Sequence, residues 1–107
     1  ARIADPQAAP ALIEAMDSKE ENVRQAAADA LLALGPDAVD PLLAALQTHK
    51  AVRVRAESAA LLGYLGDPKA VDALLQARDK DPQAKVRSAA TQSLRRLKYK
   101  PPAQPKP

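Results

Sequence analysis

The chain has 107 residues, which suffices for one domain with a modest hydrophobic core, and only 2% of its residues are aromatic. It contains no cysteine, which excludes a disulfide framework and a thiolate metal site. We find no apolar run of membrane-spanning length and no signal peptide, and therefore expect a cytoplasmic protein without membrane insertion.

The net charge of +3 is the sum of two unequal halves of the chain. Residues 1–50 carry four basic and eight acidic side chains, a balance of −4. Residues 51–107 carry twelve basic and five acidic side chains, a balance of +7. A charge gradient of this kind can steer charged partners and orient them along the molecule.

Because the sequence has no Phe and no Trp, Leu and Ala must fill the core. These residues favour helices that pack closely through small side chains, and the scarcity of β-branched residues argues against a sheet. We therefore predict an all-α protein.

The high content of Ala and Pro is also typical of bacterial proteins.

A block that opens with a Val-Arg pair and closes on leucine occurs three times, starting at Val23, Val54 and Val86. The spacings, from 23 to 54 and from 54 to 86, are 31 and 32 residues. A fixed period of this size predicts stacked helical units, none of which can bury its apolar side alone.

In chain order, residues 1–4 are typical of the end of a preceding helix. Three units follow, over residues 5–35, 36–66 and 67–98. The Pro-rich tail 99–107 cannot continue a helix and is expected to be disordered.

In the middle unit, apolar residues at helical spacing predict a first helix over roughly 38–48 and a polar loop over 47–50. A second helix follows and ends at Gly66, which we expect to form a left-handed cap, as Gly35 does one unit earlier. The third unit begins with Asp67 followed by proline, a typical start signal for a helix.

Two stretches carry the pattern of a known repeat: DPQAAPALIEAMDSKEENVRQAAADALLALG in the first unit and DPKAVDALLQARDKDPQAKVRSAATQSLRRL in the third. This pattern resembles the short type of HEAT repeat, similar to the phycobilin-lyase-like subfamily. The resemblance covers residues 1–98 and implies an armadillo-like α-solenoid (superhelix) of three HEAT-type antiparallel helix pairs. It also implies that the second helices line the concave surface on which such scaffolds bind their partners.

The last unit departs from the pattern in a way that suits the end of an array. Arg78 stands where the other units have Met16 and Leu46. Lys98 replaces the closing glycine, which makes the last unit more polar, as expected of a cap. The first unit has no such cap, which suggests further repeats, self-association or a partner at the N-terminal edge.

A helical wheel divides each second helix into an inward side, which includes Val23, and an outward side, which includes Ala56. We predict that another protein binds the outward side, at a concave face. The predicted partner-binding residues are Glu21, Gln25, Asp29, Arg53, Glu57, Tyr64, Lys85, Gln92 and Arg96. Tyr64 supplies the aromatic ring in this set, and tyrosine is enriched at interface hot spots.

The arginines of the Val-Arg pairs, Arg24, Arg55 and Arg87, could be ligands because they recur, but a structural role is the preferred interpretation. The resemblance implies that they join a ladder with acidic or carbonyl groups of adjacent repeats. The planar guanidinium suits such a role because it donates several hydrogen bonds at once.

The basic cluster Arg95, Arg96, Lys98 and Lys100 offers an alternative function, the binding of nucleic acid or an anionic surface. Cations at the end of a helix also simply complement its dipole. Only Tyr99 could stack on bases beside the cluster, so we prefer the protein partner.

We predict that the chain is not an enzyme and binds neither a metal nor a cofactor. His49 is the sole histidine and falls in a predicted loop, whereas a metal site needs several converging ligands. The serines have no histidine base in a predicted constellation. The expected function is therefore a protein-interaction scaffold without catalysis.

Overall fold

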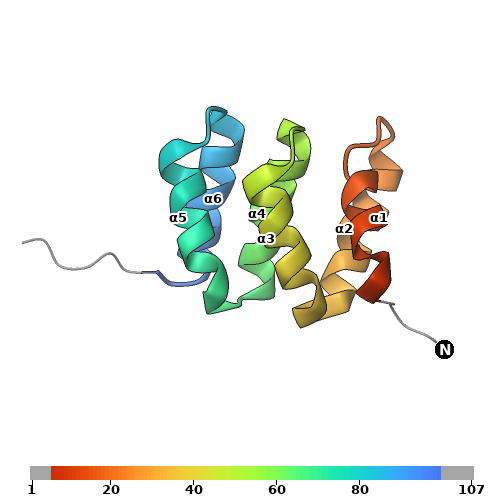
Figure 1. Ribbon diagram of the computed structural model, residues 1–107, viewed down its shortest axis with the longest axis horizontal. Coiled ribbons are helices and arrows are strands. Elements are labelled where there is room, and N and C mark those ends of the chain that lie inside the picture. Colours follow the sequence, from red (N-terminus) through yellow and green to blue (C-terminus); the bar gives the residue numbers. More distant parts are fainter. Residues whose placement is uncertain (1–5, 100–107) are drawn as a thin grey trace, which may run out of the picture.

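The computed structural model describes residues 6–99, which form six α-helices and contain no β-strand. The helices pair as α1 with α2, α3 with α4 and α5 with α6, and the pairs stack side by side (Figure 1). Their bounds are α1 Ala9–Ala15, α2 Glu21–Leu34, α3 Val39–Thr48, α4 Val52–Leu65, α5 Val71–Lys80 and α6 Ala84–Arg96. The predicted all-α solenoid of three antiparallel helix pairs is confirmed.

A short 3-10 turn leads into the first helix of every described pair, and these turns are η1 Pro6–Ala8, η2 Gly35–Ala38 and η3 Pro68–Ala70. In the middle pair the helix continues through Thr48, so the loop occupies residues 49–51 instead of 47–50. Asp67 caps the turn as predicted, because its Oδ1 accepts the Lys69 N–H at 2.9 Å.

Two predictions fall outside the described residues, namely the helical end over 1–4 and the Pro-rich tail from residue 100 onwards. Within residues 6–99, none of the helices is both long enough and apolar enough to cross a membrane.

The core is an apolar stripe that runs through all three pairs. Its fully buried leucines, each 0% exposed, are Leu31, Leu42, Leu62 and Leu74. Val54 and Val86 are also 0% exposed, but Val23 is 39% exposed, so its predicted inward position was wrong. The reason is its place in the array, since each later pair packs against the one before it and the described residues place nothing before the first.

The described residues with a positive φ occupy equivalent closing positions of the three pairs: Gly35 at 62°, Gly66 at 76° and Lys98 at 58°. Gly66 has the predicted left-handed conformation. Gly35 does not, because its ψ is −131°, in keeping with the exclusion of α-type conformations before proline. Lys98 adopts the left-handed region despite its Cβ, and the Tyr99 N–H closes the helix on the Leu94 carbonyl oxygen at 2.9 Å.

Lys98→Gly should raise the free energy of unfolding by about 0.5–1 kcal/mol, because glycine adopts a positive φ without steric strain. Urea unfolding followed by circular dichroism measures the change. Gln92→Gly, an exposed position further inside α6, is the control and should lower stability by about 1 kcal/mol. A Lys98→Gly variant that is less stable than the parent would contradict the strain at this position.

The second helices are unequally spaced, and the closest approach is between α4 and α6. A Cβ on Gly63 would lie 2.8 Å from the Ser93 Cα, so only glycine fits there. The buried Ser93 hydroxyl donates to the Ala59 carbonyl oxygen at 2.6 Å and fastens the two helices. The register of the repeats puts Leu32 and Leu61 at the equivalent positions of α2 and α4, and these helices approach less closely.

Gly63→Ala should lower the free energy of unfolding by about 1–3 kcal/mol through overpacking against Ser93. This loss outweighs the gain in helix propensity of about 1 kcal/mol that alanine brings elsewhere. Thermal and urea unfolding measure the change. A Gly63→Ala, Ser93→Gly double variant should recover part of the loss; equal stability of Gly63→Ala and parent would show that α4 and α6 can separate freely.

Candidate protein interface

The loops that join the two helices of each pair lie along the same edge of the array (Figure 1) and repeat one hydrogen-bond pattern. In every loop one side chain accepts the N–H of the N-cap residue of the second helix, at 2.9–3.1 Å: Ser18 from Glu20, His49 from Ala51 and Asp81 from Gln83. The carbonyl oxygen of the same residue accepts an arginine Nη1 at 2.7–2.9 Å, from Arg24, Arg55 and Arg87 in turn. Each arginine therefore ties a second helix to its own loop.

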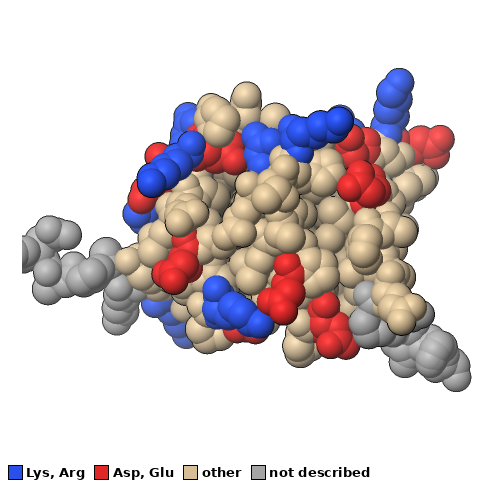
Figure 2. Space-filling view, viewed as in Figure 1, with Lys and Arg blue, Asp and Glu red and all other residues tan. Residues whose placement is uncertain are grey.

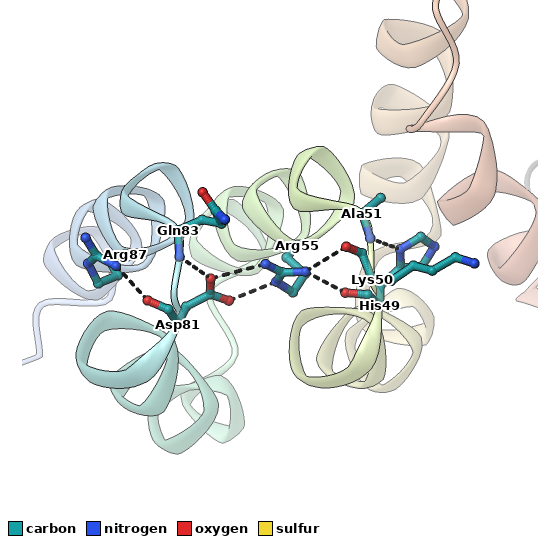
Figure 3. A network of polar contacts seen from close by, with 7 residues as sticks. All are labelled: His49, Lys50, Ala51, Arg55, Asp81, Gln83 and Arg87. Carbon is teal, nitrogen blue, oxygen red and sulfur yellow. Dashed lines mark hydrogen bonds and ion pairs between the residues drawn. The ribbon is translucent and has the colours of Figure 1, made fainter.

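Arg55 also reaches the next pair (Figure 3). Its Nε donates to Asp81 Oδ2 at 2.9 Å and its Nη2 to Asp81 Oδ1 at 3.3 Å. The two side chains are 13% and 7% exposed, so this bidentate ion pair is largely shielded from water. Its Nη1 also donates to the Lys50 carbonyl oxygen at 3.0 Å, so Arg55 links both loops.

Between the first and second pairs the link has other chemistry, because His49 occupies the position of Asp81. Its Nδ1 accepts the Ala51 N–H, which assigns the ring proton to Nε2, and Nε2 donates to the Glu14 carboxylate at 3.0 Å. Arg53 adds a second link, since its Nη1 donates to the Ser18 carbonyl oxygen at 3.0 Å. The two junctions are thus held by different side chains.

Opposing influences act on the pKa of Asp81. Burial favours the neutral acid, but hydrogen bonds from Arg55 and the Gln83 N–H, together with the charges of Arg55 and Arg87, stabilise the carboxylate. The outcome is a pKa below the ordinary value for aspartate. Asp81 therefore contributes to stability as a carboxylate.

On the side of the first helices, charged side chains gather mainly along the two rims, and the centre is largely uncharged (Figure 2). A cleft of 460 Å³ opens between α3 and α5 near the loops, but the Arg55 and Asp81 that line it are paired with each other. Its mouth carries Lys50 and Lys80. We place the candidate interface elsewhere, where the predicted partner-binding residues meet.

That place is a groove of 290 Å³ between α2 and α4. It brings together five of the predicted partner-binding residues, Glu21, Gln25, Arg53, Glu57 and Lys85. Within residues 6–99 the side chains of Glu21, Glu57 and Lys85 have no hydrogen-bond or ion-pair partner, whereas Arg53 is bonded to the loop of the first pair. The groove therefore presents carboxylates and an ammonium group that form no ion pair within the described residues.

The remaining predicted residues are also exposed but lie outside the groove. Asp29 accepts a hydrogen bond from Gln25 at 3.2 Å, and Gln92 is exposed on α6. Tyr64 is 58% exposed and is stacked by Arg96, whose guanidinium carbon lies 4.0 Å from the ring centroid. Arg96 Nη2 also donates to the Tyr64 hydroxyl at 2.9 Å, so the pair forms a preorganised aromatic and cationic surface.

A family model for HEAT repeats matches residues 33–95, and a second model for a single HEAT repeat matches residues 8–38. The chain belongs to the HEAT-repeat family. The predicted HEAT repeats are thereby confirmed.

Among curated proteins, the chain is similar to two named "Phycocyanobilin lyase subunit beta". It is 38% identical to the one from Thermosynechococcus vestitus over 92 residues, which are 86% of this chain and 43% of the relative. It is 36% identical to the one from Pseudanabaena tenuis over 92 residues, 86% of this chain and 32% of the relative. The chain thus spans less than half the length of either relative.

These names correct the prediction that the chain is not an enzyme. Both relatives are subunits of a lyase, so the HEAT repeats of this chain resemble those of an enzyme as well as those of scaffolds. The prediction rested on the lack of catalytic constellations, although the repeat pattern already resembled the phycobilin-lyase-like type. In the part of the chain that the structure describes, no group of three His, Cys, Asp or Glu residues is placed to hold a metal.

The wheel misplaced one outward residue of the HEAT array. Ala56, expected to point outward, is only 6% exposed, because α4 has a second helix on either side. It also missed residues that line the groove, namely Met16, Arg24 and Ala28. A structural role was preferred for Arg24 over a ligand role, and the recurrence of the Val-Arg pairs could not show that this residue also lines a groove.

The basic cluster is exposed where the structure describes it, at Arg95, Arg96 and Lys98. Arg96 stacks on Tyr64, and Lys100 lies outside the described residues. Binding of nucleic acid through this cluster stays a prediction.

Asp81→Asn should lower the free energy of unfolding by about 1–3 kcal/mol at neutral pH, because Arg55 loses its shielded anionic partner. The folded pKa of Asp81 is lowered, so its contribution is present above the unfolded carboxyl pKa of about 4 and is lost as pH falls through the folded value. Urea unfolding from neutral to acid pH should therefore show the stability difference between parent and variant shrinking in acid.

The control is Asp79→Asn. Asp79 also has a lowered pKa, caused mainly by the hydrogen bond from Arg78, but its side chain is 55% exposed. Solvent screening should leave this variant close to the parent in stability. Equal effects at Asp79 and Asp81 would contradict the special role of the Arg55–Asp81 pair.

Proposed function

We propose that this chain is a protein-binding unit of a lyase related to phycocyanobilin lyase subunit beta, and that a partner protein binds its second-helix face. Solenoids of stacked helix pairs offer extended surfaces suited to this task. The observation that carries the proposal is the groove between α2 and α4, which gathers charged residues of both signs without partners among the described residues.

The shape and chemistry of the face support protein recognition. Tyr64 and Arg96 form a rigid exposed pair, and Tyr and Arg are the residues most enriched at interface hot spots. Glu57 and Lys85 in the groove can direct a partner into one orientation by charge complementarity.

The relationship supports the assignment to a lyase. The match covers 86% of this chain, and the relative from T. vestitus is named as one subunit, which implies a protein assembly. We infer that the helix pairs of this chain contact another protein within such an assembly.

A hybrid protein tests the proposal. This chain replaces the matching 92-residue segment in the T. vestitus subunit, and the hybrid is assayed for lyase activity and for co-purification with the rest of its assembly. We expect both to be retained above the level of a subunit that lacks the segment. Glu57→Lys in the hybrid should weaken assembly by about tenfold, because it reverses a charge in the groove.

The matched control is Asp72→Lys, the same charge reversal at an exposed residue of α5 on the opposite side. This variant should assemble like the parent hybrid. If the hybrid is inactive and unassembled although its helical content is intact, the relationship to the lyase does not extend to function. If Glu57→Lys and Asp72→Lys behave alike, the partner binds elsewhere.

A further inference from the structure

The exposed charge of the second helices changes sign along the array. The exposed carboxylates of α2 are Glu21 and Asp29, while its Arg24 is bonded to a loop carbonyl oxygen. The sequence of α6 contains no acidic residue, and its exposed cations are Lys85, Arg95 and Arg96. One end of the face is therefore acidic and the other end basic.

A surface of this kind is complementary to itself when turned end over end. Resting on the proposal that this face binds protein, we infer that the partner is a second copy of this chain, related by a two-fold axis parallel to the helices. This operation places α2 of each copy against α6 of the other, so the same favourable contact forms twice. A parallel arrangement would instead bring α2 against α2 and set like charges against each other.

The heights of the charges along the helices agree with this arrangement, because a two-fold axis parallel to the helices preserves height. In the register set by Val23 and Val86, Lys85 lies one residue from the level of Glu21. Arg96 lies about one helical turn from the level of Asp29, within the reach of its long side chain. Glu21 thus meets a cation at nearly its own level, and Asp29 meets one about a helical turn away.

At the centre of this interface α4 meets α4 of the second copy. Because the axis preserves height, Arg53 lies level with Arg53 of the other copy and Glu57 with Glu57. The Arg53 and Glu57 side chains, both exposed and four residues apart, can therefore pair only diagonally, across about one helical turn. Tyr64, the most exposed large side chain of apolar character in residues 6–99, would lose its contact with water there. The interface therefore has an aromatic element flanked by complementary charges.

Sedimentation velocity over a concentration series tests the inference. The parent protein should form dimers that dissociate as salt is raised, because the flanking pairs are exposed. In one variant Glu21 and Asp29 both become Lys, and in another Lys85 and Arg96 both become Glu. Each should weaken its own dimer by about tenfold or more, and an equimolar mixture of the two should restore a dimer of mixed composition.

A second measurement does not depend on charge reversal. The chain has no cysteine, so Tyr64→Cys introduces a single thiol near the two-fold axis. Mild oxidation should cross-link this variant into dimers, whereas the control Ala44→Cys, exposed on α3, should remain largely uncross-linked. Folding of every variant is checked by circular dichroism.

The inference is overturned if the parent sediments as a monomer at every concentration, if the mixture of variants fails to pair, or if both cysteine variants cross-link equally. A monomeric parent whose Glu57→Lys hybrid still loses assembly would leave the proposed function intact and show that the partner is another protein. A dimer with a fully active Glu57→Lys hybrid would overturn the proposed function instead.

Discussion

Each helix pair of this protein completes its core only against a neighbouring pair. Leu31, Leu62 and Leu94 recur at one position of the second helices and belong to a single stripe that crosses every boundary between pairs. Because the units are nearly alike, the side chains that differ at the boundaries decide how closely neighbours approach. The small residues Gly63 and Ser93 bring α4 and α6 together, whereas α2 and α4, which have leucines at the equivalent positions, approach less closely and border a groove.

In the loops, too, one position differs between the pairs and determines how neighbouring pairs are joined. Ser18, His49 and Asp81 perform identical tasks for their own pair, since each accepts an N-cap N–H and offers a carbonyl oxygen to arginine. They differ in what they do for the neighbour. The carboxylate of Asp81 accepts the arginine of the preceding pair, whereas the imidazole of His49 cannot accept that arginine while it bonds Ala51 and turns its N–H to Glu14. The recurring arginine therefore binds its second helix to the loop of the same pair. The loop residue of the next pair determines whether the arginine also joins the two pairs.

Much of this architecture could be predicted from the sequence because it repeats. The period, the Val-Arg pairs and the closing residues specify helices and their inward sides, and Gly66 and Asp67 behave as their types require. The errors arise where the environment of a residue comes from another unit. Val23 lacks the cover that Val54 has, and Ala56 is covered from two sides. The groove is lined by residues of all three units, among them Glu21, Glu57 and Lys85, so no single repeat contains the information. The repeat pattern indicated the phycobilin-lyase-like type, but it could not show whether the chain is related to an enzyme in function, since HEAT helix pairs have the same pattern in scaffolds and in enzymes.

The close contact of Gly63 with Ser93 also has a mechanical consequence. The second and third pairs are joined by interlocked backbones and a shielded ion pair, so they should behave as one stiff block. The first pair is attached through bulkier side chains and exposed hydrogen bonds, which yield more readily to bending. The array should therefore bend mainly at the boundary between α2 and α4. A molecule bound between these two helices would then determine the curvature of the array.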